Sequence, residues 1–452
     1  MTLHSRFLGF ALVLALFGTA SAQSAHSINV NLKETRLANG LRVITVEDHG
    51  APVIALDITY NVGSRNERPG RTGFAHLFEH MMFKGSENVG TGEHFYLIFN
   101  NGGNMNGTTN EDRTTYFEAL PANQLDLALY LEADRMRSLV INKANLDNQR
   151  NAVQEERRLG VDNQPYGQSG EVQQGLLYDN FAYKHTVIGS MEDLNAATVE
   201  DVAAFFKTYY APNNAVLALV GDFKTADALK RIKQYFEPIP RQPDPAAVDM
   251  TEPEQKAERR ASVDDALARL AQVDLAFKAV PGNTSDFYAL QVLSAALQGG
   301  QSSRLYQALV KDKQLVTNVG GFMDEKRGTG ALYTSATLRQ GVKPADVEAA
   351  IYDEIERLKK DGIADWELQK AKNTTRRNFI NNMQSSLSRA LNISVWTVYY
   401  NDPNLINTRL DKVMAVTKED VQRVANKYLA ATNRTVVITI PKPKAAAAAT
   451  QQ

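Results

Sequence analysis

The chain has 452 residues, with 50 Lys and Arg, 51 Asp and Glu, and a formal net charge of −1. This length allows two or three domains, and the balanced charge argues against nucleic acid or an anionic membrane surface as a partner. The chain contains no cysteine, which excludes disulfides, thiol nucleophiles and cysteine-ligated metal sites, so any metal must be bound by histidine and carboxylate side chains.

The first residues have the pattern of an export signal. Arg6 precedes an apolar stretch from Phe7 to Phe17, and Ala20-Ser21-Ala22 fits the small-residue rule for cleavage. We therefore expect residues 1–22 to be a signal peptide cleaved after Ala22, with export to a bacterial periplasm. An uncleaved anchor is the alternative. No later segment is apolar for long enough to span a membrane, so no stable membrane insertion is expected.

The next elements are a hairpin and a helix. Asn39-Gly40, between short apolar segments in residues 36–44, predicts a two-residue β-turn. Residues 72–85 predict a helix with Thr72 as N-cap and Gly85 just past its end. This helix is apolar on nearly every side, so we expect it to be buried.

The buried helix carries three ionisable side chains, His76, Glu79 and His80, within an arc of about 100°. Burying such groups is costly unless they are paired or bind a metal. Two histidines four residues apart can chelate zinc, and a carboxylate beside them can act as a base. The sequence His-x-x-Glu-His is the inverted form of a zinc-peptidase motif. A buried hydrogen-bonded polar cluster is the alternative.

A catalytic zinc ion needs a third protein ligand. The predicted helix over residues 143–159 offers Glu155 and Glu156. Glu156 falls near the middle of its apolar side and Glu155 points toward solvent, so Glu156 is the better ligand. The alternative is a salt bridge between Glu156 and an arginine of a neighbouring element.

An internal repeat with a constant offset divides the chain into two similar halves. It pairs Thr198, Glu200, Asp201, Val202, Tyr209 and Asn214 with Thr417, Glu419, Asp420, Val421, Tyr428 and Asn433. Five prolines between residues 238 and 253 indicate a linker. We predict two homologous α+β domains, each an α/β sandwich with a mixed, mainly antiparallel sheet, at residues 30–237 and 256–441. Residues 238–255 join them, and residues 442–452 form a disordered tail.

These motifs together resemble the pitrilysin/insulinase family of zinc peptidases, and most closely the branch that includes the subunits of mitochondrial processing peptidase. The resemblance covers nearly the whole mature chain. It extends from His76-Leu77-Phe78-Glu79-His80 to Glu156 on the later helix. It also includes the segments Asn39–Val43, Asn106–Thr109, Thr115-Tyr116, Gln154–Arg158 and Gly300–Leu305.

The resemblance implies one zinc ion per chain, bound by His76, His80 and Glu156, with Glu79 as the base that takes a proton from the attacking water. It also implies that unfolded peptides add as a β-strand to the segment that contains Asn104, Met105, Asn106, Gly107 and Thr108. From the residues alone, this Gly- and Asn-rich segment would be interpreted as a turn.

The chain departs from the family pattern at two places, one in each half. Gln149 stands where the family usually has a second carboxylate near the zinc, which would lower the metal affinity. The second half has Ala289, Val292 and Leu293 at the positions that match the zinc motif, so it binds no metal in this way, as is normal for the family. Active single-chain members also have an Arg and a Tyr that contact substrate, and the matching residues here are Val310 and Thr317.

The missing Arg and Tyr predict a heterodimer with a homologous subunit that supplies them, and a homodimer is the alternative. Three functions remain open at this point. The first is a zinc endopeptidase or oligopeptidase that acts on unfolded peptides. The second is a non-catalytic peptide-binding or structural subunit of the same family. The third is another zinc hydrolase, such as an amidase.

Overall fold

The structure of the protein is a computed structural model that describes residues 29–442. The expected signal peptide at residues 1–22 and nearly all of the expected tail lie outside the described residues. None of the helices within residues 29–442 is long and apolar enough to cross a membrane.

The first half of the chain forms a six-stranded mixed sheet in the order β1-β2-β6-β3-β5-β4. Only β2 and β6 pair in parallel. The strands are β1 (Leu32–Arg36), β2 (Arg42–Glu47), β3 (Val53–Tyr60), β4 (Asn104–Thr109), β5 (Thr114–Pro121) and β6 (Ala215–Gly221). The helices of this half are α1 (Phe74–Met81), α2 (Glu93–Asn100), α3 (Leu125–Ser138), α4 (Lys143–Arg157), α5 (Gly167–Leu177), α6 (Phe181–Lys184), α7 (Met191–Ala196), α8 (Val199–Tyr209) and α9 (Thr225–Phe236).

The second half forms a five-stranded sheet in the order β7-β11-β8-β10-β9, which repeats the first sheet without β1. Its strands are β7 (Arg259–Asp265), β8 (Gln272–Lys278), β9 (Val316–Met323), β10 (Ala331–Leu338) and β11 (Arg434–Pro441). Its helices are α10 (Ser285–Gln298), α11 (Pro344–Asp361), α12 (Asp365–Asn382), α13 (Ser386–Tyr400), α14 (Leu405–Met414) and α15 (Lys418–Tyr428). The predicted fold class, with two homologous mixed sheets packed against helices, is therefore confirmed. Residues 240–256 contain neither helix nor strand.

The central strand β6 is buried along its whole length, because helices cover both faces of the first sheet. Leu217 and Leu219 belong to the core shared with α1, α3, α8 and α9. Val216, Ala218 and Val220 face the opposite side and pack against α13 of the second half. The sheet thus separates two apolar layers, and one of them is completed by the other half of the chain.

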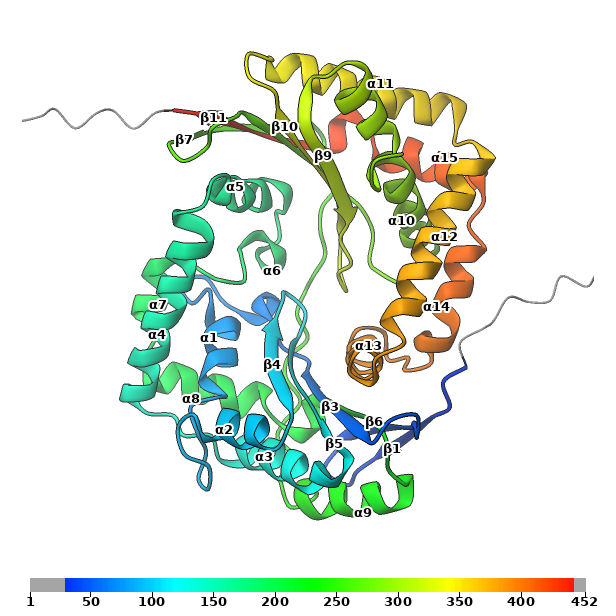
Figure 1. Cartoon of the computed structure of the whole chain (residues 1–452). Coiled ribbons are helices and arrows are strands. Elements are labelled where there is room, and N and C mark those ends of the chain that lie inside the picture. Colours follow the sequence, from blue (N-terminus) through cyan, green and yellow to red (C-terminus); the bar gives the residue numbers. More distant parts are fainter. Residues whose placement is uncertain (1–28, 443–452) are drawn as a thin grey trace, which may run out of the picture.

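The two halves exchange one helix each across their interface (Figure 1). Helix α13 lies on β3 and β6 of the first sheet, and α5 lies on β7, β8 and β11 of the second. These helices begin at Gly167 and Ser386, and their starts are separated by the same offset as the repeat partners Thr198 and Thr417. Where α13 packs on the first sheet, the buried Asp57 of β3 accepts a hydrogen bond from Ser394 of α13. The exchange makes the sheet of each half depend on the other half for its cover.

The residues that define the repeat have the same structural roles in both halves. Thr198 and Thr417 are N-caps, and each accepts a hydrogen bond from the backbone N–H three residues later. The side-chain amides of Asn214 and Asn433 donate to the carbonyls of Tyr209 at 2.8 Å and Tyr428 at 2.7 Å. The repeated pattern therefore encodes a capped helix, a fixed turn and a buried strand.

Two local predictions are wrong in detail. The first hairpin pairs Arg36 with Arg42, so its connection is longer than the two-residue turn expected around Asn39-Gly40. The side chain of Asn39 instead donates to the carbonyls of Phe236 and Ile239. Thr72 is not the N-cap of α1, because its hydroxyl donates to Asp193 and Gly73 takes the cap position with φ of 83°.

Candidate metal centre

Helix α1 carries two of the candidate metal ligands and is held in place by apolar packing along one side. Phe74, Ala75, Leu77, Phe78 and Met81 are buried in the first core. His76 and His80 are on the other side of the helix, where their side chains are 12% and 26% exposed. The apolar side fixes the helix, and the polar side is left within reach of α4.

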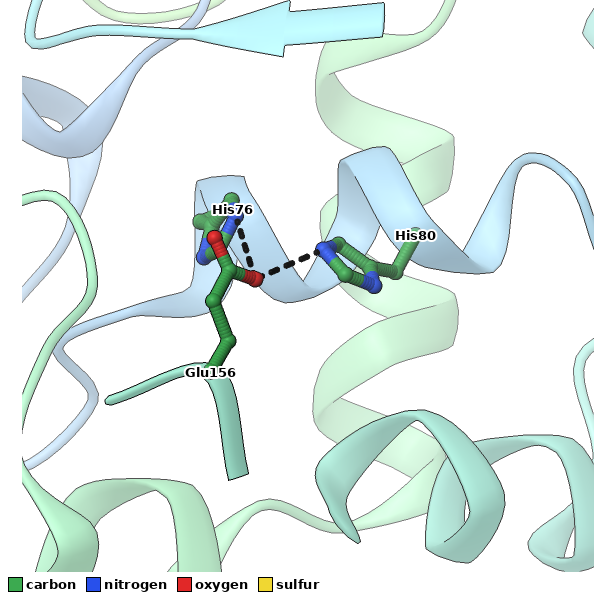
Figure 2. A group of neighbouring side chains, drawn as sticks. All are labelled: His76, His80 and Glu156. Atoms are coloured by element: carbon green, nitrogen blue, oxygen red, sulfur yellow. Dashed lines mark ion pairs between the residues drawn. The ribbon is translucent and has the colours of Figure 1, made fainter. Parts of the chain in front are cut away.

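Glu156 extends from the last turn of α4 toward both histidines (Figure 2). Its Oε2 atom lies 3.5 Å from Nε2 of His76 and 3.3 Å from Nε2 of His80. In a tetrahedral zinc site with bonds of about 2.1 Å, neighbouring donor atoms are about 3.4 Å apart. The donor spacing therefore fits a zinc ion between the three side chains. Glu156 is half exposed, and Glu155 is 57% exposed and pairs with Arg158.

The electrostatics of the group also fit a cation. Burial, with the nearby His80, lowers the pKa of His76 to about 4, so His76 is neutral at pH 7 and offers a lone pair. The hydrogen bond with His80 lowers the pKa of Glu156, which therefore stays ionised. Nδ1 of His76 is buried without a hydrogen-bond partner among the described residues. Two imidazoles and one carboxylate are a donor set that zinc prefers.

Glu79 is beside the ligands but faces strand β4. Its Oε2 accepts a 2.6 Å hydrogen bond from Thr109, the last residue of β4. A Cβ atom added to Gly107 would lie 3.0 Å from Cγ of Glu79, so the strand backbone passes directly over this carboxylate. Burial raises the pKa of Glu79. A carboxylate with a raised pKa is suited to take up a proton.

Strand β4 is the edge of the first sheet nearest to α1, so one side of its backbone has no partner strand among the described residues. Asn104 and Asn106 are exposed, whereas Met105 and Gly107 face inward and Thr108 is partly buried. An edge strand of this kind can accept an extended peptide as an added strand. The segment is a strand and not the turn that its Gly and Asn content alone suggests.

The other residues singled out in the sequence lie outside this group. Gln149 is buried on α4, two helical turns before Glu156. Its side-chain amide donates to Asn148 at 2.5 Å. Val310 is partly buried against the apolar core of the second half. Thr317 is exposed on β9, where its hydroxyl donates to the carbonyl of Thr337.

A second set of potential ligands, His94, Glu118 and Glu132, is buried beside α3. Nε2 of His94 lies 3.6 Å from Oε2 of Glu118. Arg135 already binds both oxygens of Glu132, so the charge of this carboxylate is paired within the protein. Burial lowers the pKa of His94 and raises that of Glu118, so we interpret the set as a buried polar cluster around the Glu132–Arg135 ion pair.

The chain is similar to known peptidases along most of its length. Residues 42–181 match the model of the insulinase family, peptidase family M16, and residues 196–375 match the model described as the peptidase M16 inactive domain. The chain is 32% identical over 439 residues to the zinc protease PqqE of Helicobacter pylori, and the match covers 96% of this chain and 98% of that protein.

Two further matches extend the comparison. The chain is 25% identical over 426 residues to a probable mitochondrial-processing peptidase subunit beta of Arabidopsis thaliana, covering 90% of this chain and 78% of that protein. The crystal structure of a protease from Helicobacter pylori superimposes with a TM-score of 0.87 at 32% identity, over 91% of this chain and 100% of that one.

Proposed function

Because the chain belongs to the insulinase family of peptidases, family M16, we propose that it is a zinc metallopeptidase that hydrolyses unfolded peptides. The observation that carries the proposal is the convergence of His76, His80 and Glu156 on one point, with Glu79 directly beside them. A related protein named as a zinc protease supports the same metal.

In this proposal each residue has one role. His76, His80 and Glu156 bind zinc, which when bound supplies a Lewis acid that polarises the substrate carbonyl. Glu79 takes the proton from the attacking water. Strand β4 receives the peptide through main-chain hydrogen bonds along Asn104–Thr108, and side-chain pockets select the sequence.

Metal removal tests this function. We expect the purified protein, with its partner present, to contain one zinc ion per chain and to cleave an unfolded peptide. A chelator should abolish cleavage, and added zinc should restore it, because the proposed reaction needs the Lewis acid that bound zinc supplies. Cleavage that persists in protein shown to be free of metal would rule the proposal out.

A non-catalytic, peptide-binding or structural subunit is the second candidate, because residues 196–375 match a family model described as an inactive domain. The first half argues against it, since a subunit that only binds peptide has no need for Glu79. Peptide binding without any cleavage, in the presence of zinc and of a family partner, would favour this candidate.

We further propose that the chain is the zinc-bearing subunit of a heterodimer. Hydrolysis needs donors where negative charge develops on the carbonyl oxygen, and Val310 and Thr317 cannot act as the Arg and Tyr that the family pattern places there. The likeness to a relative named as a subunit beta supports this.

We expect the chain alone to bind zinc but to cleave peptides about 10²–10³-fold more slowly than with a homologous partner that carries the Arg and Tyr. Cleavage rates with and without the partner, at equal zinc content, measure the effect. Full activity of the chain alone, as a monomer or homodimer, would contradict the heterodimer.

We also propose that the protein is exported, on the basis of Arg6, the apolar stretch after it and Ala20-Ser21-Ala22. Mass spectrometry of the protein expressed in a bacterium should find Gln23 at the N-terminus, in the periplasmic fraction. Full-length chain in the cytosol would contradict export.

A further inference from the structure

The first turn of α1 lacks the usual side-chain cap. The first backbone N–H groups of a helix have no partner within the helix, and a Ser, Thr, Asp or Asn at the N-cap normally accepts from one of them. Here the N-cap is Gly73, which has no side chain, and Thr72 is engaged with Asp193. His76 follows only three residues later, so whatever binds these N–H groups also positions the first candidate ligand.

Glu67 supplies the missing cap from outside the helix. Its Oε2 accepts from the N–H of Gly73 at 2.9 Å, and its Oε1 accepts from the N–H of Ala75 at 2.8 Å. The Glu67 side chain has no exposed surface, so this carboxylate depends on its protein partners. A negative charge at the start of a helix also interacts favourably with the helix dipole.

The third partner of Glu67 is His185, which follows α6. Nε2 of His185 lies 2.9 Å from Oε2 of Glu67 and 3.1 Å from the carbonyl of Ser64, and Nδ1 lies 2.9 Å from the carbonyl of Phe181. Both ring nitrogens thus face oxygen acceptors. A neutral imidazole carries only one N–H, so this arrangement requires a second proton, shared with Glu67.

The position of that proton follows from the other contacts of Glu67. Burial raises the pKa of Glu67, and the hydrogen bonds from His185 and from two backbone N–H groups oppose that rise. The proton is therefore held between Glu67 and His185. Burial alone would lower the pKa of His185, but the hydrogen bond and charge of Glu67 outweigh it and raise that pKa. The ring of Phe181 stacks on the imidazole at 4.4 Å and holds its orientation.

We propose that His185 is a positioning residue for the metal centre, which acts by holding Glu67 as the cap of α1 and so fixes His76. This deepens the proposed function, on which it rests. Among the described residues, no hydrogen bond or ion pair joins His185 to the three candidate ligands. Its effect passes through Glu67 and the backbone of α1. Groups hydrogen-bonded directly to a metal ligand typically change the metal affinity by about 10–100-fold when they are lost, so a residue further out is expected at the lower end of that range.

The test compares His185→Gln, Glu67→Gln and the double variant with the unaltered protein. Two quantities are measured for each: the zinc dissociation constant, by competition with a chelator, and the amide hydrogen exchange of residues 73–77. His49→Gln is the matched control, because His49 also pairs with a carboxylate, that of Asp222 at 2.6 Å, on an exposed surface. Exchange in β6 reports on the stability of the whole domain.

We expect each single variant to speed exchange in residues 73–77, to leave β6 protected and to weaken zinc binding about tenfold. The double variant should be no worse than the more affected single one, because both residues act through one cap. His49→Gln should change neither quantity. Co²⁺-substituted His185→Gln should show an altered visible spectrum, since the cobalt bands follow the geometry of the ligands.

Unchanged exchange and zinc affinity in His185→Gln would overturn the proposal, as would multiplied losses in the double variant. Failure of the proposed function gives a different result. If the unaltered protein bound no zinc, the zinc proposal would fall, while faster exchange in residues 73–77 would still show that His185 anchors the helix.

Discussion

Replacing Glu79 by Gln is expected to leave zinc bound and to lower peptide cleavage by about 10²–10⁴-fold, the usual contribution of a general base. Gln has nearly the same shape as Glu, and its carbonyl oxygen can still accept from Thr109. The substitution therefore removes the proton acceptor and little else. Cleavage rate and zinc content, measured on the same sample, separate loss of the base from loss of the metal.

Glu87→Gln is a suitable control for this variant, because Glu87 is 62% exposed shortly after α1 and pairs only with Arg137 among the described residues. It should cleave at the normal rate. Normal turnover in Glu79→Gln would show that another group accepts the proton and that the assigned mechanism is wrong. Loss of zinc in the same variant would instead assign Glu79 to metal binding.

Replacing Glu156 by Gln is expected to weaken zinc binding by at least about 100-fold, the upper end of what a partner one step removed from the metal contributes. Gln lacks the negative charge, and two neutral imidazoles alone are a poor zinc site. Cleavage at limiting zinc should fall in parallel. Zinc titration with a competing chelator measures the change.

Glu155→Gln is the matched control on the same helix. Glu155 is one residue away, is 57% exposed and pairs with Arg158. Its replacement removes a negative charge but leaves the three candidate ligands in place. This variant should bind zinc normally. Equal losses in both variants would mean that only the overall charge of the helix end matters, and the ligand assignment would fail.

The sequence predicts the part of the site that local geometry determines. His76, Glu79 and His80 share one helix, so the 3.6-residue period alone places them on one side. Glu156 is harder to predict, because it lies on a different helix, far along the chain. The apolar pattern of its own helix and the family resemblance single it out. The structure brings it to both histidines.

The contacts that depend on tertiary packing left little signal in the sequence. His185 looks like an isolated structural histidine, and Glu67 lies in a loop without a recognisable motif, yet they meet across 118 residues. By residue type Thr72 is the best N-cap candidate for α1, but its hydroxyl donates to Asp193 instead. The exchange of α5 and α13 is equally hidden, since both helices lie before the repeat residues that begin at Thr198 and Thr417.

The central claim is that His76, His80 and Glu156 bind zinc together, and anomalous X-ray diffraction from crystals of the zinc-loaded protein tests it most directly. Data collected on both sides of the zinc absorption edge place the metal without reference to activity. The account predicts one zinc peak per chain, within about 2.2 Å of a nitrogen of each histidine and an oxygen of Glu156. A peak at any other position, or none between these three side chains, would contradict it.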